Sequence, residues 1–212
     1  MTEAPASTVM QRFAAPEEEA RANFYALLAR LYADAPDAAL LAAIAAAKPL
    51  TIETEQTTAR DLAHAWDVLR TASAVMDPDA AAAEYQDLFV GVGKSEVSLY
   101  ASAYVSRIGG SVLADVRGAL ATLGFGRQPG VNVFEDHLSS VLEVMRVLIV
   151  GGPGVEPMSV LRQREFFIAY VSPWILECCN AITTSGIANY YRRVAEFTEF
   201  FVAIERDSFA IE

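Results

Sequence analysis

Apolar side chains recur every three or four positions along most of the chain, which is the spacing of one face of an α-helix. No stretch shows the strict alternation of apolar and polar residues that is typical of a half-buried strand. We therefore predict an all-α fold, a compact single-chain bundle of about eight or more helices. The predicted helices cover residues 17–32, 37–47, 53–76, 78–90, 99–123, 134–150, 158–184 and 187–207.

Several of these helices have recognisable ends. Asp77 stands before Pro78, an arrangement of capping residue and first helical residue that starts a helix, and Gly91 is expected to end it. Ser98 is expected to cap the next helix, and Pro173 to kink or break the one that contains it. The third helix is expected to turn four apolar residues inward, Leu62, Trp66, Leu69 and Val75.

Two glycine-rich segments interrupt the helical pattern. Residues 124–132 and residues 151–157 are the candidate hinges, because Gly and Pro end helices and permit sharp turns. Residues 1–15 lack the basic start and the apolar core of a secretory signal, and we predict a disordered tail there. Residues 16–212 are predicted to form one helical domain.

Charge and composition restrict the possible partners. The chain has 16 Lys and Arg against 27 Asp and Glu, a net charge of −11, which argues against nucleic acid and is compatible with a basic peptide. Acidity can also simply keep an apolar chain in solution. No apolar run reaches the roughly 18 residues that span a bilayer, so stable membrane insertion is not expected. Cys178 and Cys179 are adjacent and are predicted to be reduced and buried, which favours the cytoplasm.

Polar residues gather in two short segments, residues 84–104 and 135–138. Within the first, Gly91-Val-Gly-Lys-Ser95 looks like the end of a phosphate-binding loop. The complete motif needs a glycine where Leu88 stands and a buried strand before the loop, whereas a helix is predicted there. A weak nucleotide hydrolase that uses Lys94 and Ser95 is therefore the least supported alternative.

The residues of common catalytic and metal sites are also missing. A di-iron bundle needs two acidic-x-x-His pairs, but only Asp61 precedes a histidine, His64, at that spacing, and Phe134 takes the same place before His137. No Gly-x-Ser-x-Gly nucleophile motif occurs. We therefore expect no catalytic residue, no metal and no cofactor. Asp136-His137 either caps and packs a helix, or forms a polar pair at the mouth of a groove that binds a peptide backbone or a basic side chain.

Taken together, these motifs resemble those of the TorD/DmsD/NarJ family of redox-enzyme maturation chaperones, most closely its TorD/DmsD branch. The resemblance covers residues 17–207, and three motifs carry it. Tyr-x-x-Leu-Phe-x-Gly and Tyr-x-Ser-x-Tyr appear at Tyr85, Leu88, Phe89, Gly91, Tyr100, Ser102 and Tyr104. Asp-His-Leu appears at residues 136–138, and a weaker Phe-Phe then Pro-Trp pattern at Phe166, Phe167, Pro173 and Trp174.

The resemblance implies a larger N-terminal part and a smaller C-terminal part, joined by a hinge. It implies a cytoplasmic chaperone that binds the twin-arginine signal peptide and the apoprotein of a molybdopterin-dependent oxidoreductase, assists cofactor insertion and delays export. A NarJ-like assembly factor for a molybdoenzyme subunit that is not exported is the alternative within the family. Either a monomer or a domain-swapped dimer is compatible with the glycine-rich hinges.

The implied peptide site combines carboxylates with an apolar groove, which complements two arginines followed by an apolar stretch. Asp136 is the implied arginine-facing group, with Glu135 nearby and His137 as a hydrogen-bonding partner. The residues implied to line or support the groove are Leu88, Phe89, Gly91, Tyr100, Ser102, Tyr104 and Trp174. The chain departs from the family where Leu99 replaces a proline and where Val133-Phe134 replaces Glu-Pro, and client choice is expected to depend on these positions.

Overall fold

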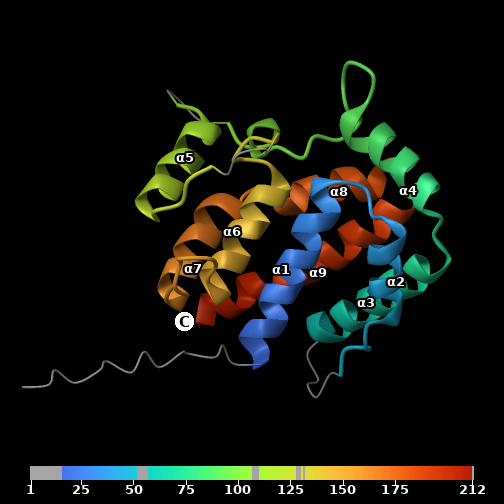
Figure 1. Cartoon of the computed structure of the whole chain (residues 1–212), viewed down its shortest axis with the longest axis horizontal. Helices are drawn as coiled ribbons and strands as arrows, with labels where there is room; N and C mark the ends of the chain where they lie inside the picture. Colours follow the sequence, from blue (N-terminus) through green and yellow to red (C-terminus); the bar gives the residue numbers. More distant parts are fainter. Residues whose placement is uncertain (1–15, 52–56, 107–109, 128–129, 131, 212) are drawn as a thin grey trace, which may run out of the picture.

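The computed structural model describes residues 16–51, 57–106, 110–127, 130 and 132–211. Within these ranges the fold is all-α, with nine α-helices and no strand (Figure 1). The predicted fold class is therefore confirmed for this part of the chain. The disordered tail predicted for residues 1–15 lies outside the described residues.

The helices are close in extent to the predicted segments, with one exception that is described below. The α-helices are α1 (Pro16–Ala33), α2 (Ala38–Ala46), α3 (Thr57–Val75), α4 (Pro78–Tyr85), α5 (Val112–Thr122), α6 (Leu138–Val150), α7 (Val160–Phe166), α8 (Ile175–Thr184) and α9 (Tyr190–Ile211). Two π-helical turns, Gln86–Val90 and Phe167–Val171, continue α4 and α7, and a 3₁₀ turn covers Ala101–Ala103.

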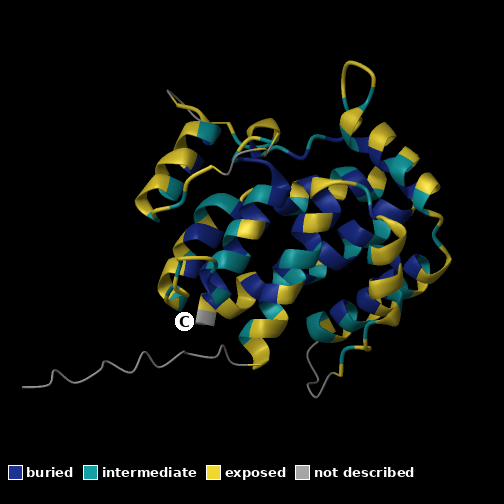
Figure 2. Ribbon diagram, in the orientation of Figure 1, coloured by how far each residue is buried: buried dark blue, intermediate teal, exposed yellow. Residues whose placement is uncertain are grey.

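The helices pack around α1 and α9. Helix α6 lies along α1, while α3 and α8 lie against α9 and α2 covers α3 (Figure 1). The apolar faces merge into one core that contains residues from α1 through α9, visible as the dark inner faces in Figure 2. Aromatic rings join the layers: Phe24 of α1 contacts Trp66 of α3 and Phe197 of α9 edge-on.

Helix α5 is the exception to this close packing. It lies at the edge of the molecule in Figure 1, and most of its surface is exposed or half-buried in Figure 2. Only Val112 and Val116 among its residues are buried. Its main packing is against the 3₁₀ turn at Ala101–Ala103. Few buried contacts hold a helix weakly, so α5 is more easily displaced than the central helices α1 and α9.

The predicted caps account for several helix ends. The Asp77 carboxylate accepts hydrogen bonds from the backbone N–H groups of Asp79 and Ala80 at 2.9 and 3.0 Å, and Pro78 begins α4. Gly91 ends the π-helical turn that follows with a φ of 65°, a conformation that side chains with a Cβ rarely adopt. These boundary predictions are confirmed.

The predicted helix over residues 99–123 is wrong in its first part, where Ser98 does not cap a helix, and is confirmed only for Val112–Thr122; residues 107–109 lie outside the described ranges. The backbone near Leu99 instead bonds to the segment before α6: Leu138 N–H donates to the Leu99 carbonyl at 2.8 Å, and Ala101 N–H donates to the Asp136 carbonyl at 2.9 Å. These tertiary bonds take the backbone groups that a helix would use. Helix α5 starts only at Val112.

Two further expectations concern single residues. Val75 was expected to face the core, but it is 83% exposed because it ends α3 off the buried stripe, which passes through Leu69 and Ser73. Pro173 was expected to break a helix, and this is confirmed: the chain bends by 48° between Val160–Val171 and Ile175–Thr184.

A test of length and apolar composition shows which described helices could cross a bilayer. No single one is long and apolar enough. The bent pair Val160–Val171 and Ile175–Thr184 passes the test only when the two segments are taken together.

One buried ionic cluster lies within the bundle. Glu205 of α9 is 2% exposed and receives two hydrogen bonds from the Arg21 guanidinium of α1, at 2.7 and 2.8 Å, and one from the Tyr25 hydroxyl at 2.9 Å. Burial alone would lower the pKa of Arg21, but the hydrogen bond and the charge of Glu205 raise it. A buried carboxylate is tolerated only when it is paired in this way, so the cluster sets how α1 lies on α9.

Candidate functional site

The two polar segments singled out in the sequence meet in space. Tyr100 and His137 form an isolated antiparallel bridge, flanked by the backbone bonds that involve Leu99, Ala101, Asp136 and Leu138. The Tyr100 and His137 rings meet edge-on, with centroids 4.8 Å apart. The fold therefore brings the Tyr-x-Ser-x-Tyr motif and the Asp-His motif into one structural unit at the start of α6.

Asp136 is 1% exposed, so its carboxylate does not lie open at a rim. Its Oδ2 atom accepts a hydrogen bond from the backbone N–H of Ser102 at 3.2 Å, and its carbonyl accepts one from Ala101. The side chain of Ser102 itself is exposed. A short turn therefore separates the Asp136 carboxylate from solvent, and a ligand would have to move this turn to reach the carboxylate.

His137, rather than Asp136, caps α6. Its Nδ1 atom accepts a hydrogen bond from Ser139 N–H at 3.2 Å and lies 2.7 Å from the Ser139 hydroxyl oxygen. Burial lowers the pKa of His137 to about 4, against the opposing charge of Asp136. The imidazole is therefore neutral at pH 7, and because Nδ1 accepts, the proton is assigned to Nε2.

Tyr104 and Trp174 pack against each other next to this unit. Their rings stack with centroids 5.8 Å apart and planes 21° from parallel. The Tyr104 hydroxyl donates to the Ser98 carbonyl at 2.7 Å, and Trp174 Nε1 donates to the Tyr170 carbonyl at 2.8 Å. Trp174 is 1% exposed. The polar atoms of both side chains are satisfied inside the protein, so these residues hold the turn in place.

Phe89 belongs to an aromatic cluster, next to the buried Leu88 and two residues before Gly91. Leu88 is fully buried, and the Phe89 ring packs edge-on against Tyr85 and Tyr191, with centroids 5.2 and 4.9 Å apart. This cluster joins α4 to α9. Its connection to the Asp-His unit runs through the backbone, where Val97 N–H donates to the Leu88 carbonyl at 2.8 Å. Leu88 and Phe89 also belong to the same apolar core as Leu138, the residue that follows His137.

Glu135 is the acidic residue of the segment that lies near the surface. Its Oε2 atom is 2.9 Å from Nε of Arg117, and its Oε1 atom is 3.5 Å from Nη1 of Arg127. The same two guanidinium groups lie 6.0 Å from the centroid of the half-exposed Phe134 ring. Burial works to raise the pKa of Glu135, but its backbone hydrogen bond and the two arginines bring it below its ordinary value.

Sequence reasoning missed three residues of this region. Arg117 and Arg127 belong to no motif, and their positive charge in an acidic chain was the only signal that could have indicated them. Glu84 opens the first polar segment, and its carboxylate accepts hydrogen bonds from the backbone N–H groups of Asn189, Tyr190 and Tyr191 at 2.8, 3.0 and 2.8 Å. It thereby caps α9 across the fold. A glutamate inside an Ala-rich helix gives no local signal for that role.

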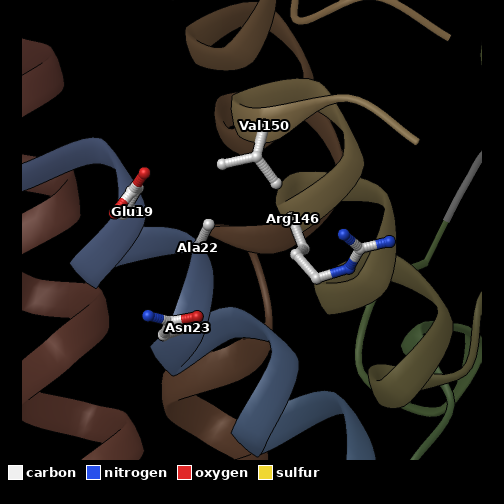
Figure 3. A pocket seen from close by; sticks show the side chains of 5 residues that line it. All are labelled: Glu19, Ala22, Asn23, Arg146 and Val150. Atoms are coloured by element: carbon white, nitrogen blue, oxygen red, sulfur yellow. The ribbon is translucent and has the colours of Figure 1, made fainter. Parts of the chain in front are cut away.

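Two surface hollows lie away from Asp136 and His137. One, of about 150 Å³ between α1 and α6, is lined by Glu19, Ala22, Asn23, Arg146 and Val150 (Figure 3). The other, of about 280 Å³, lies between α5 and the segment Val160–Val171 and is lined by Ala119, Thr122, Leu123, Arg162, Glu165, Phe166, Ala169 and Tyr170. Across the described ranges, no group of three or more His, Cys, Asp or Glu side chains is placed to hold a metal ion.

Comparison with known families adds one match. The sequence profile described as "Nitrate reductase delta subunit" matches residues 55–180. The matched range includes both polar segments and ends within α8. No curated protein matches the chain.

Proposed function

The chain belongs to the nitrate reductase delta subunit family, a family of molybdoenzyme maturation chaperones, and we propose that it is a cytoplasmic chaperone of the TorD/DmsD type. In this role it binds the twin-arginine signal peptide and the apoprotein of a molybdopterin-dependent oxidoreductase. It assists cofactor insertion and delays export until the client is mature. The function is binding rather than catalysis.

The junction of the two polar segments is the observation that carries this proposal. Two consecutive residues supply carboxylates there: Glu135 lies near the surface beside Arg117, and Asp136 is buried beneath the turn that contains Ser102. Guanidinium groups bind carboxylates through paired, charge-assisted hydrogen bonds. We assign Glu135 to the first contact with the peptide arginines, and Asp136 to a second contact that forms when the Ser102 turn moves.

A direct binding assay tests the proposal. A labelled synthetic peptide with two consecutive arginines before an apolar stretch is titrated with the protein, and fluorescence anisotropy is recorded. We expect saturable binding, about tenfold weaker for Asp136→Asn and for Glu135→Gln, because each substitution removes one charge-assisted contact. Asp207→Asn, which changes the same charge at an exposed position of α9, is the matched control.

The outcomes separate the function from the site. Absence of saturable binding to the unmodified protein would overturn the proposed function. Affinity that is equal in Asp136→Asn, Glu135→Gln and the control would overturn the site and leave the function standing. Circular dichroism of each variant verifies that the helical content is retained.

A second candidate is favoured by the wording of the matching family, which names a nitrate reductase subunit. In this version the chain assembles a molybdoenzyme subunit that is not exported, as the NarJ branch does. The two versions differ in what the client must carry. Co-purification of the protein with a client whose twin-arginine leader has been deleted supports the NarJ version, and loss of the complex on that deletion supports the TorD/DmsD version.

A further inference from the structure

The surface carboxylate of the proposed peptide site is already occupied by arginines of the same chain. Arg117 of α5 and Arg127 of the following segment both lie within 3.5 Å of Glu135, and both lie over the Phe134 ring. Two guanidinium groups on one carboxylate, beside an aromatic ring, repeat the chemistry that a twin-arginine peptide would offer. Phe134 stands where the family has proline, so this aromatic ring is a feature of the present chain.

The contacts of these arginines are suited to exchange. The side chains of Arg117 and Arg127 are 49% and 38% exposed, and ion pairs between such exposed groups contribute little to stability. The helix that carries Arg117 is also lightly packed, with only Val112 and Val116 buried (Figure 2). An incoming pair of arginines can therefore replace the internal pair without breaking the core.

The same helix borders an apolar hollow. Ala119 and Thr122 of α5 and the next residue, Leu123, form one wall of the 280 Å³ hollow. Phe166, Ala169 and Tyr170 form the apolar part of the other wall, and Arg162 and Glu165 add a charged pair to it. In Figure 1, α5 lies beside α6 and α7, outside the main bundle. A movement of α5 would thus free Glu135 and widen the hollow together. A peptide with arginines followed by an apolar stretch has the two chemistries, in adjacent positions, that such a movement would expose.

We propose that α5 and Arg127 act as an internal stand-in for the signal peptide. In the free protein Arg117 and Arg127 neutralise Glu135, and the two arginines of the leader replace them while its apolar stretch enters the hollow between α5 and Val160–Val171. The inference rests on the proposed function and adds that peptide binding is a competition with the chain itself. No bond is made or broken in the exchange apart from ion pairs and hydrogen bonds.

Removing the charges of Arg117 and Arg127, the internal competitors of the peptide, tests the inference. The double variant Arg117→Gln/Arg127→Gln is titrated with the labelled twin-arginine peptide and is compared with Arg30→Gln/Arg206→Gln. The control also removes two positive charges, from exposed ion pairs elsewhere on the surface. Both double variants therefore have the same net charge and the same long-range attraction for a cationic peptide. We expect the first variant to bind about three- to tenfold more tightly than the control, since each exposed ion pair accounts for roughly a fivefold change at most.

Hydrogen exchange gives a second readout. When the peptide binds the unmodified protein, amides in Val112–Thr122 should exchange faster, because α5 leaves its contacts, whereas amides in Leu138–Val150 should not. Equal or weaker peptide affinity of the Arg117/Arg127 variant relative to its control overturns the inference, as does stronger protection of α5 on binding. Peptide binding by that variant alone supports it, and absence of binding in every variant overturns the proposed function with it.

Discussion

Tyr100 and His137 face each other across an isolated antiparallel bridge, with their ring centroids 4.8 Å apart. The bridge joins two segments that are separated in the sequence by all of α5. It places the Ser102 N–H over the Asp136 carboxylate and fixes the start of α6 at His137. The proposed peptide site is therefore held by a few backbone hydrogen bonds outside the helices, where a change of conformation is least costly.

The buried imidazole of His137 makes the free energy of unfolding depend on pH. Its pKa is lowered to about 4 by burial, while in the unfolded chain it has the ordinary value near 6.5. The unfolded state therefore takes up a proton first, so this contribution is fully present above pH 6.5 and is lost as the pH falls toward 4. We expect the loss for His137 to be on the order of 3 kcal/mol.

Substitution of His137 by Asn isolates this effect. Asn can still cap α6 but does not titrate, so the free energy of unfolding of His137→Asn should fall less steeply between pH 7 and 4 than that of the unmodified protein. Urea unfolding followed by circular dichroism at several pH values measures the difference. His64→Asn, at an exposed position of α3, is the control. Parallel pH profiles for His137→Asn and the unmodified protein would show that the imidazole is not buried in its neutral form.

The cap that Glu84 places on α9 predicts a large effect from a residue that is not in the core. Glu84→Ala leaves three N–H groups at the start of α9 without their acceptor and should destabilise the protein by roughly 2–3 kcal/mol. Glu84→Gln retains one carbonyl oxygen and should cost about half as much. Chemical denaturation measures both, with Glu199→Ala, an exposed residue of α9, as the control. Equal stability of Glu84→Ala and that control would contradict the cap.

Arg21 and Glu205 should behave as one unit. Arg21→Met leaves the buried Glu205 carboxylate with only the Tyr25 hydroxyl bond and should cost about 3–5 kcal/mol. Adding Glu205→Leu should restore part of this loss, because an apolar pair needs no compensating charge. A double-mutant cycle by denaturant unfolding measures the coupling. Additive losses would mean that the two side chains do not stabilise each other.

Cys178 and Cys179 should be unreactive in the folded protein. Burial raises the pKa of the Cys178 thiol to about 12, and burial also raises the pKa of the Cys179 thiol well above its ordinary value. The thiolate is the reactive form. A thiol reagent at pH 8 should therefore modify both residues quickly in denaturant, and in the native protein only at the rate of unfolding. Rapid modification of the native protein in the absence of denaturant would contradict the buried position of α8.

Local sequence determined most of the helices and several of their ends. The three- and four-residue spacing of apolar side chains marks a buried stripe, Asp77-Pro78 starts α4, Gly91 stops the turn after it, and Pro173 bends the chain. Each of these signals acts through neighbouring residues, and none needs a partner from elsewhere in the fold. The polar segments were also visible as departures from the apolar pattern.

Tertiary structure alone decided the conformation of residues 98–106 and which groups meet at the site. Their apolar pattern is helical, but Leu99 and Ala101 bond to the segment before α6, and Glu84 caps a helix that follows it by about a hundred residues. Arg117 and Arg127 both pair with Glu135, a meeting that no motif in the sequence predicts. The spacing of apolar residues along the chain indicates which face of a helix is buried. The pairing of distant polar groups depends on how the helices pack, so only the structure could show these pairs.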